Sequence, residues 1–481
     1  MKDAVREGRV LVVDLDGTLI RSDMLLETFW GAFGCNWQVP LIAGAALLRG
    51  GRAALKRRLA QLAPPDPATL PYAPEVLGYI DRWRAAGGRV ALVSAADQGL
   101  VQAVADHLGR FDEVHGSDGR SNLKGAAKGQ LLAARFGRGG YVYIGDSTAD
   151  LAVWRDAARA VTAGVPAGLR TQVDGLGVPS EHLPGAGGGM ATLMTAMRPH
   201  QWLKNLLVFM PVLAGHHFGM AILGQSLLAF LAFCLVASAV YLINDLLDLA
   251  ADRAHPRKRA RPLASGALPL GHGSVAAPLL LVAGLAVAAV LEPRFLAVLA
   301  GYFLLTLLYS LWLKRVVVAD IVTLSVLYTA RIVAGGVATG IIMSVWLLAF
   351  SIFFFLAMAA VKRQAELVDS AERGVLQTAG RGYRADDLPL VAQMATASGY
   401  LSVLVLALYL NTPSVQQLYP YPPLLWGICL VLLYWISRVV MITHRGGMDD
   451  DPILFAVRDP ISRVCILLVL ALAVAATAVP A

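Results

Sequence analysis

The sequence predicts two parts of different class. The first is an α/β domain with a doubly wound parallel sheet and a small helical cap; the second is an all-α domain that crosses a membrane repeatedly. Over the first 177 residues, short apolar runs alternate with helical patterns, which is typical of a parallel sheet covered by helices. From residue 190 onward, nine long apolar segments follow one another. With 57% hydrophobic and 15% charged residues, the 481-residue chain has the composition of a membrane protein.

Charge and cysteine content exclude other classes. The net charge of +8 does not indicate a nucleic-acid partner, because the cations cluster in short loops between apolar segments. The four cysteines have neither paired nor metal-ligand spacing, which argues against a disulfide framework and against a zinc site. No apolar run in the first twenty residues is long enough for a cleavable signal peptide, so none is expected.

Polar side chains follow three apolar runs of the α/β part, at 10–13, 89–93 and 141–144. Carboxyl ends of parallel strands meet at one edge of a sheet, where α/β proteins bind ligands, so we expect these side chains to lie close together. With one lysine that opens a helical segment, the residues are Asp14, Asp16, Ser94, Lys128, Asp146 and Asp150.

This spacing resembles the haloacid dehalogenase (HAD) phosphatases, all of whose motifs can be placed in the first 177 residues. The resemblance implies that Asp14 is the nucleophile that attacks phosphorus and that Asp16 is the general acid/base. It also implies that Ser94 hydrogen-bonds the phosphate and that Lys128 neutralises developing charge. Lys124 competes for the lysine role, and we prefer Lys128 because of its position beside the helix.

The same resemblance implies that Asp146 and Asp150 hold Mg²⁺ together with Asp14. A carboxylate can attack a phosphoryl group only if a metal and a lysine offset the repulsion between anions. The alternative is a HAD fold that has lost catalysis and serves as a scaffold. The presence of both Asp14 and Asp16 favours an active enzyme.

The cap should span about residues 22–79 and be mostly helical. Its segment 37–48 is apolar and is followed by Arg49 and Arg52, which allows two interpretations. The segment is either the core of the cap or a surface that touches a bilayer, and we expect the core. We place the HAD-like domain at 1–177, a Gly/Pro-rich linker at 178–189 and the membrane domain at 190–481.

A membrane-spanning helix needs about 20 apolar residues, and the first of the nine candidate segments is short for a span. The segments lie near 205–217, 221–243, 275–291, 295–313, 317–340, 345–361, 388–410, 423–443 and 461–480.

Charge predicts the topology of these segments. Lys and Arg concentrate in the loops 253–262, 314–315, 362–384 and 444–460. The loops on the opposite side carry one cation, Arg294. Because cytoplasmic loops are enriched in Lys and Arg, we expect a multi-pass protein of the inner membrane, with the α/β domain in the cytoplasm and the carboxyl terminus outside.

An acid-rich stretch follows the second apolar segment. Three carboxylates and an amide recur there at helical spacing, and cations follow at once. Carboxylates that can hold Mg²⁺, beside cations that can hold phosphate oxygens, are what a diphosphate leaving group requires. The alternative is a charged loop that anchors a helix at the membrane surface, but acids on one helical face are costly to desolvate without a cation. The residues are Asn244, Asp245, Asp248, Asp252, Lys258 and Arg261.

Nine helices with the pattern N-D-x-x-D-x-x-x-D after the second resemble the UbiA superfamily of intramembrane prenyltransferases. In that family, the first acidic motif binds Mg²⁺ and the diphosphate of the donor. A second acidic motif is expected after the sixth helix, where this chain has Lys362 and Arg363 instead.

That departure, with Lys204 in the stretch 198–205 and with the loop 448–452, resembles the branch that includes polyprenyl-phosphate phosphoribosyltransferases. The resemblance implies phosphoribosyl diphosphate as donor and a polyprenyl phosphate lipid as acceptor. Mg²⁺ on Asp245, Asp248 and Asp252, with the cations around it, would offset the charge of both substrates. Asn244 would add a neutral ligand or hold the ribose. Lys258, Arg261, Lys362 and Arg363 are the cations implied.

The two resemblances together predict a bifunctional enzyme of the bilayer. The membrane domain would transfer 5-phosphoribose to the lipid, and the HAD domain would remove the 5-phosphate from the product. One alternative is a prenyltransferase that moves an isoprenoid to a small acceptor, with an unrelated or regulatory HAD domain. Another is a transporter or membrane scaffold. The sequence leaves a homo-oligomer open.

Overall fold

The structure is a computed structural model that describes residues 2–118, 122–185, 187–374, 381–448 and 451–478. Two compact units divide the chain. The first comprises Met1–Arg198 and Tyr241–Leu279, and the second comprises Pro199–Val240 and Leu280–Ala481.

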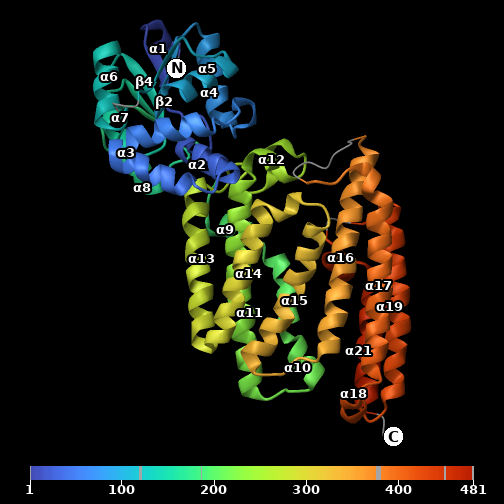
Figure 1. The fold of residues 1–481 in the computed structure, drawn as a ribbon. Coiled ribbons are helices and arrows are strands. Elements are labelled where there is room, and N and C mark those ends of the chain that lie inside the picture. Colours follow the sequence, from blue (N-terminus) through green and yellow to red (C-terminus); the bar gives the residue numbers. More distant parts are fainter. Residues whose placement is uncertain (1, 119–121, 186, 375–380, 449–450, 479–481) are drawn as a thin grey trace. The chain divides into compact units, whose positions relative to one another are not determined.

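A six-stranded sheet forms the centre of the first unit, with strand order β3-β2-β1-β4-β5-β6 and every neighbouring pair parallel (Figure 1). The predicted doubly wound parallel sheet is therefore confirmed. The sixth strand lies inside the stretch 178–189 that we assigned to the linker, so the sheet extends into that stretch. The strands are β1 (Val10–Val13), β2 (Val90–Asp97), β3 (Glu113–Ser117), β4 (Tyr141–Gly145), β5 (Arg159–Ala163) and β6 (Ser180–Leu183).

Helices cover both faces of the sheet. In β1, Leu11 and Val13 pack in one core with α4 and α5, whereas Val10 and Val12 pack in the other with α6, α7 and α8. This alternation follows from the opposite directions of successive side chains in a strand, and it leaves the strand buried on both faces. The helices are α1 (Lys2–Arg6), α4 (Pro74–Ala85), α5 (Gln98–Leu108), α6 (Ala126–Phe136), α7 (Leu151–Trp154) and α8 (Ala167–Asp174).

The cap is a helical hairpin of α2 (Met24–Cys35) and α3 (Val39–Leu62), followed by the short helix η1 (Pro67–Thr69). Ala32 of α2 packs against Val39 and Leu59 of α3. Gly51 has a φ of 66°, so the helical backbone of α3 breaks there. The helical cap is as expected. Within 37–48, Val39 is in the core of the cap as expected, but a core position was wrong for Trp37, Leu41 and Leu48, which are 56%, 69% and 89% exposed.

The first unit also contains the segment that follows α11 (Met220–Leu247). This segment comprises α12 (Leu249–Ala254), η4 (Lys258–Ala260) and the start of α13 (Leu270–Leu291). Two contacts join it to the cap helix α2. Arg253 forms a buried ion pair with Glu27, and Trp30 Nε1 donates a hydrogen bond to Ser274 Oγ at 2.9 Å. The cap and the acid-rich stretch are therefore directly connected.

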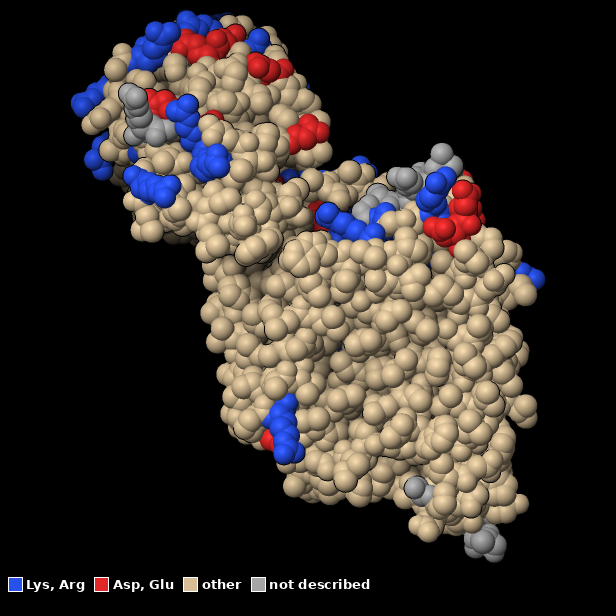
Figure 2. All heavy atoms as spheres, viewed as in Figure 1, with Lys and Arg blue, Asp and Glu red and all other residues tan. Residues whose placement is uncertain are grey.

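Within the described part of the chain, eight helices are long and apolar enough to cross a membrane. On the face shown in Figure 2, the surface of the long helices is largely uncharged between their ends. These observations confirm a multi-pass membrane protein. The helices are α11, α13, α14 (Pro293–Leu311), α15 (Ala319–Thr339), α16 (Val345–Glu372), α17 (Leu388–Leu410), α19 (Trp426–His444) and α21 (Pro460–Ala478).

The first predicted segment, 205–217, overlaps a 3₁₀ helix, η3 (Pro199–Phe209), that continues into a short α-helix, α10 (Met210–Gly215). A 3₁₀ helix rises about 2.0 Å per residue and an α-helix about 1.5 Å, so the two together reach about 31 Å. This length is comparable with the hydrocarbon core of a bilayer, which is about 30 Å thick. A segment too short as an α-helix thus reaches the length of a span because most of it is wound as 3₁₀.

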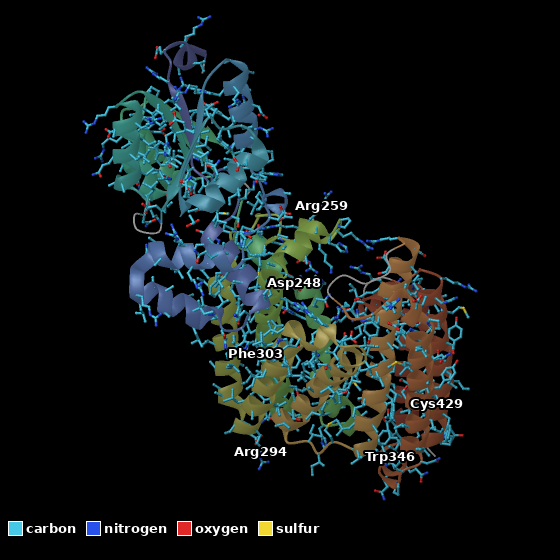
Figure 3. The ribbon with its side chains drawn as sticks, turned by 45° about the horizontal axis from the view of Figure 1, so that its top comes forward. Asp248, Arg259, Arg294, Phe303, Trp346 and Cys429 are labelled. Atoms are coloured by element: carbon cyan, nitrogen blue, oxygen red, sulfur yellow. The ribbon has the colours of Figure 1, made fainter. Side chains whose placement is uncertain are left out.

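Short elements complete the chain: α9 (Met190–Met197), η2 (Thr148–Asp150), η5 (Leu313–Arg315), η6 (Ala385–Asp387), α18 (Pro413–Leu418), η7 (Pro422–Leu425) and α20 (Pro452–Arg458). In the second unit, Arg294 and Trp346 lie at the same end of the long helices (Figure 3), which agrees with placing the loops 292–294 and 341–344 on one side of the membrane. The loop expected at 362–384 begins later than predicted, because α16 continues as a helix through Lys362 and Arg363 to Glu372.

Candidate active sites

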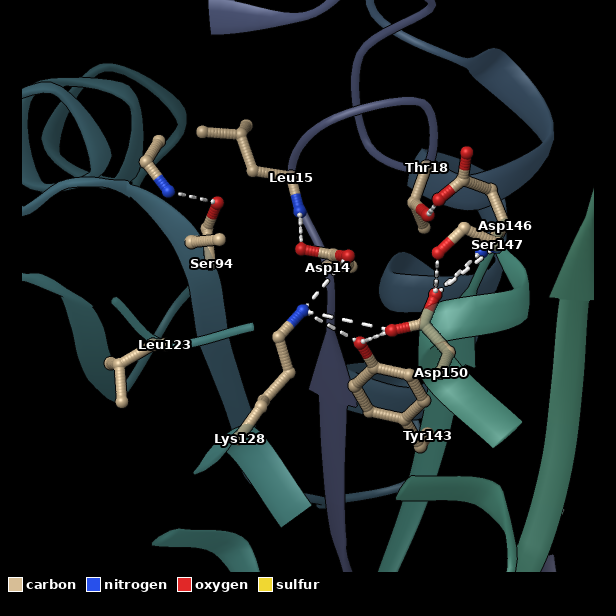
Figure 4. Close-up of polar contacts among 12 residues, drawn as sticks. Asp14, Leu15, Thr18, Ser94, Leu123, Lys128, Tyr143, Asp146, Ser147 and Asp150 are labelled. Carbon is tan, nitrogen blue, oxygen red and sulfur yellow. Dashed lines mark hydrogen bonds and ion pairs between the residues drawn. The ribbon is translucent and has the colours of Figure 1, made fainter. Parts of the chain in front are cut away.

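Lys128 and Asp14 form the centre of the site at the carboxyl edge of the sheet (Figure 4). Lys128 Nζ lies 2.9 Å from Asp14 Oδ2 and 3.8 Å from Asp150 Oδ1, and it donates a hydrogen bond to Tyr143 OH. Burial alone would lower the pKa of Lys128, but the two carboxylates raise it above its ordinary value. The ammonium group therefore stays charged beside the predicted nucleophile, whereas Lys124 is exposed.

Three carboxylates of this site are close enough to share a metal ion. Asp14, Asp146 and Asp150 each offer one oxygen, and these oxygens lie within 4.8 Å of one another. Burial, with the neighbouring carboxylates, raises the pKa of Asp146 well above its ordinary value. A divalent cation would offset this repulsion, and a set of oxygen donors suits Mg²⁺. The predicted ligands therefore fit the predicted metal.

Asp150 is oriented by its neighbours. Its Oδ2 accepts hydrogen bonds from the backbone and hydroxyl groups of Ser147 at 3.1 and 3.0 Å, and its Oδ1 accepts one from Tyr143 OH at 2.8 Å. These donors hold the carboxylate in one orientation, as ligands of a metal are commonly held by surrounding hydrogen bonds.

Asp16 lies two residues beyond the nucleophile, where its Oδ1 accepts a hydrogen bond from the backbone of Met24 at 2.8 Å. Burial, reinforced by the charge of Asp23, raises the pKa of Asp16 to about 7. A carboxyl group with this pKa can both donate and accept a proton near neutral pH, which suits the predicted role of general acid/base.

Ser94 does not face the cavity that holds Asp14, as a phosphate ligand would. Its side chain is fully buried in β2, and its Oγ accepts a hydrogen bond from Ala96 N at 3.0 Å (Figure 4). Ala95 and Ala96, rather than Ser94, contribute to the wall of the cavity that holds Asp14. A contact of Ser94 with phosphate would thus require its hydroxyl to turn from this backbone group.

The cavity at this site has a volume of about 710 Å³, and all its walls belong to the first unit. One wall comes from the cap, including Lys56 of α3, whose Nζ donates to Ala95 O at 2.6 Å. Another wall comes from residues 266–272, which include the first turn of the membrane-spanning helix α13. Neither wall could be predicted from the sequence, because no local pattern indicates that α3 or residues 266–272 lie beside Asp14.

The acid-rich stretch forms a second cluster in the first unit. Arg261 Nη1 lies 3.1 Å from Asp245 Oδ1 and 2.6 Å from Asp252 Oδ2, so it bridges two predicted metal ligands. Arg198, which precedes Pro199, also pairs with Asp245. Burial raises the pKa of Asp252, although Arg261 opposes this effect. The structure therefore brings Asp245, Asp252 and Arg261 together and adds Arg198, whose role the sequence did not reveal.

The other predicted residues of this stretch lie around that cluster. Asp248 is half-buried at the start of α12 (Figure 3). Lys258 is exposed in η4, next to Arg259. Asn244 Oδ1 is buried, and among the described residues no donor lies within hydrogen-bond distance of it. An orphaned amide oxygen beside carboxylates fits a metal ligand. Because Arg261 bridges two of the acids, a metal on Asp245, Asp248 and Asp252 stays a prediction.

In the second unit, Lys204 of η3 pairs with Asp451. Burial alone would raise the pKa of Asp451, but the ammonium groups of Lys204 and Lys362 hold it below its ordinary value. Two of the predicted substrate-binding cations therefore converge on one carboxylate that the sequence placed in the loop 448–452. Asp449 and Asp450 of that loop lie outside the described residues.

Arg363 does not occupy the position expected of a substrate ligand. Its side chain is 0% exposed, its Nη2 lies 2.7 Å from Asp320 Oδ2, and its Nη1 contacts Glu366. Arg381 lies 3.7 Å from Asp320 and 3.6 Å from Glu366 on the same two acids. The loop predicted to begin at Lys362 is corrected, because α16 continues to Glu372 and Arg363 is an internal ion-pair partner within the helix packing. The role of Arg363 as a substrate ligand stays a prediction.

Comparisons with known proteins agree with this division. The UbiA prenyltransferase family matches residues 205–451, which is more than half of the chain. The chain belongs to the UbiA prenyltransferase family. The haloacid dehalogenase-like hydrolase family matches residues 11–155, so this UbiA protein carries a fused HAD domain. Both resemblances expected from the sequence are confirmed.

Three relatives illustrate the range of this UbiA group. The protein y4nM of Sinorhizobium fredii is 39% identical over 459 residues, which cover 94% of this chain and 88% of y4nM. Nodulation protein NoeC of Azorhizobium caulinodans is 40% identical over 277 residues, which cover 57% of this chain and 90% of NoeC. Decaprenyl-phosphate phosphoribosyltransferase of Corynebacterium glutamicum is 34% identical over 265 residues, which cover 54% of this chain and 79% of that enzyme.

Proposed function

We propose that the membrane domain transfers 5-phosphoribose from phosphoribosyl diphosphate to a polyprenyl phosphate lipid. The observation that carries this proposal is the cluster in which Arg261 lies between Asp245 and Asp252. Such a cluster can bind a diphosphate through its guanidinium group and the metal of that diphosphate through its carboxylates. The name of the Corynebacterium glutamicum relative supports transfer of a phosphoribosyl group to a polyprenyl phosphate.

The region after the sixth predicted span favours a sugar diphosphate over a prenyl diphosphate. Glu366 of that region and Asp320 of α15 are both paired with Arg363 and Arg381. Carboxylates paired with a fully buried arginine are poor ligands for a second metal ion, because each would have to give up a buried ion pair. Arg261 of the acid-rich cluster is 29% exposed, whereas Arg363 is 0% exposed. A donor whose diphosphate needs only one acidic motif is consistent with this arrangement.

In the proposed reaction, the bond between the anomeric carbon and the diphosphate breaks as an oxygen of the lipid phosphate bonds to that carbon. Arg261 and Lys258 would hold the leaving diphosphate, and Lys204 and Lys362 would hold a phosphate of the acceptor or donor. Mg²⁺, when bound by Asp245, Asp248 and Asp252, supplies positive charge for the leaving group. No side-chain nucleophile is required, since the acceptor is already an anion.

We further propose that the HAD domain removes the 5-phosphate from the lipid product. Residues of the first turn of α13, a membrane-spanning helix, line the cavity that holds Asp14. A phosphate carried on a membrane lipid can reach a cavity with such a wall without leaving the bilayer. Asp14 would attack phosphorus, Lys128 would offset the charge that develops, and Asp16 would protonate the sugar oxygen that leaves. Water, deprotonated by Asp16, would then hydrolyse the aspartyl phosphate.

The proposed topology places the HAD domain and the acid-rich stretch in the cytoplasm of the cell. The cations of the loops 253–262, 314–315, 362–384 and 444–460 support this orientation. A tethered phosphatase then meets the lipid product at high effective concentration on the same face of the membrane.

The test supplies the purified full-length protein in lipid with labelled phosphoribosyl diphosphate and polyprenyl phosphate. The wild type should give a labelled lipid. Asp252→Asn should not, because it removes a carboxylate proposed to bind the Mg²⁺ of the leaving diphosphate. Mass spectrometry of the product should show one phosphate more in Asp14→Asn than in the wild type. Unchanged transfer by Asp252→Asn would refute the transferase proposal, and identical phosphate content would refute the phosphatase proposal.

A further inference from the structure

An apolar stripe runs along the first half of α3 on the outside of the cap. Leu41 and Leu48, seven residues apart in α3, lie on one face of the helix and are 69% and 89% exposed. Trp37, in the turn just before α3, is 56% exposed. Val39 and Leu59 lie on the opposite side of α3, where they pack against α2. The stripe is therefore not part of the cap's core, and a large apolar surface of this kind needs a partner.

The position of α2 indicates what that partner is. Trp30 of α2 donates a hydrogen bond to Ser274, which belongs to the second turn of the membrane-spanning helix α13. The cap hairpin thus lies where α13 enters the bilayer. Because α3 packs against α2, the cap hairpin as a whole lies next to the first turns of α13.

Charge points to the same partner. Arg49 and Arg52 follow the stripe, and both side chains are exposed. Long cationic side chains at the end of an apolar helical face can reach the phosphates of anionic lipids while the apolar face enters the acyl boundary. Such a helix, apolar on one face and basic at its end, is typical of a segment that lies in the interfacial layer of a membrane.

We propose that residues 37–50 bind the surface of the lipid bilayer and dock the HAD domain there. The break at Gly51, with its φ of 66°, separates this segment from the second half of α3. The first half can then lie in the membrane plane while the second half keeps Lys56 at the wall of the HAD cavity. The docking itself does not rest on the proposed phosphatase reaction.

The experiment uses the full-length protein in nanodiscs. A Cys35→Ser background removes an exposed thiol; the other three cysteines are buried. An environment-sensitive fluorophore is attached at Leu41→Cys in the stripe or, as a matched control, at Gln61→Cys, an exposed position in the second half of α3. Nitroxide groups on the upper acyl chains of the lipids then quench any fluorophore that enters the interface.

Quenching at position 41 should exceed that at position 61 by about twofold or more, and anionic lipid should increase it. Adding Leu48→Gln should reduce quenching at position 41 toward the control without disturbing the core. Equal quenching at both positions would overturn the proposal. A fluorophore at position 41 that is shielded but insensitive to the nitroxides would also overturn it, since a second protein copy would then cover the stripe.

A kinetic measurement separates this proposal from the proposed function. Leu41→Gln with Leu48→Gln should slow hydrolysis of a lipid-borne phosphomonoester but leave hydrolysis of p-nitrophenyl phosphate unchanged. If neither substrate is hydrolysed by the wild type while position 41 is still quenched, the docking stands and the phosphatase proposal falls.

Discussion

The ion pair between Glu27 of the cap and Arg253 of α12 provides the sharpest test of the fold. Arg253 donates from Nη1 at 3.0 Å and from Nη2 at 2.6 Å, so the carboxylate is held in a bidentate geometry. The two side chains are 3% and 6% exposed. Removal of one partner from a buried pair typically costs about 3–5 kcal/mol, because it leaves an uncompensated charge.

Glu27→Gln removes the charge and keeps the shape of the side chain. We expect α2 and α12 to lose about 10²- to 10³-fold of their protection from hydrogen exchange, since each 1.4 kcal/mol corresponds to about a factor of ten. Exchange is measured by mass spectrometry on the full-length protein in detergent. Arg253→Met combined with Glu27→Gln should recover much of the loss, because no buried charge remains.

The matched control is Arg89→Gln, which breaks a pair with Glu113 whose arginine is 62% exposed. An exposed pair contributes about 0–1 kcal/mol, so local protection should change less than tenfold. The reasoning would be refuted if Glu27→Gln had no larger effect on α2 than Arg89→Gln has on the adjoining strand β2.

Three further predictions concern the two sites. Lys128→Met should lower phosphatase turnover by about 10²-fold or more, whereas Lys124→Met should retain most of it, because only Lys128 lies beside the nucleophile. Arg261→Gln should lower phosphoribose transfer by a similar factor, while Arg259→Gln, exposed in the same segment, should leave it nearly unchanged. Mg²⁺ binding to the HAD site should tighten as the pH rises, because the raised pKa of Asp146 means that the metal must displace protons. Calorimetry in buffers of different ionisation enthalpy should detect the release of protons on Mg²⁺ binding, and Asp146→Asn should reduce the number released. Equal proton release by Asp146→Asn and the wild type would contradict the prediction.

The convergence of the carboxylates that the resemblance assigned to a metal follows from the topology of the sheet. Asp14 and Asp146 each come directly after a parallel strand, and neighbouring strands bring their carboxyl ends to one edge. The acid-rich cluster could be predicted in part, since helical spacing places its members on one side. The ion pair between Arg198 and Asp245 could not, because Arg198 comes from a segment 47 residues away in the chain.

Two predictions failed for physical reasons. An apolar period of 3.6 residues is the same for a helix face against a core and for one against a membrane, so the pattern alone could not place residues 37–48. Arg363 was assigned to a loop because charge ended the apolar run, but buried ion pairs with Asp320 and Glu366 allow α16 to continue past that point.

The winding of η3 has a mechanical consequence. Each of its 11 residues that rewinds from 3₁₀ to α shortens the segment by about 0.5 Å and rotates it by about 20°. Rewinding the turn from Pro199 to Lys204 would therefore swing the Lys204 ammonium by about 100° around the helix axis, away from Asp451. A change in the winding of this segment would therefore change both its length and the position of one cation.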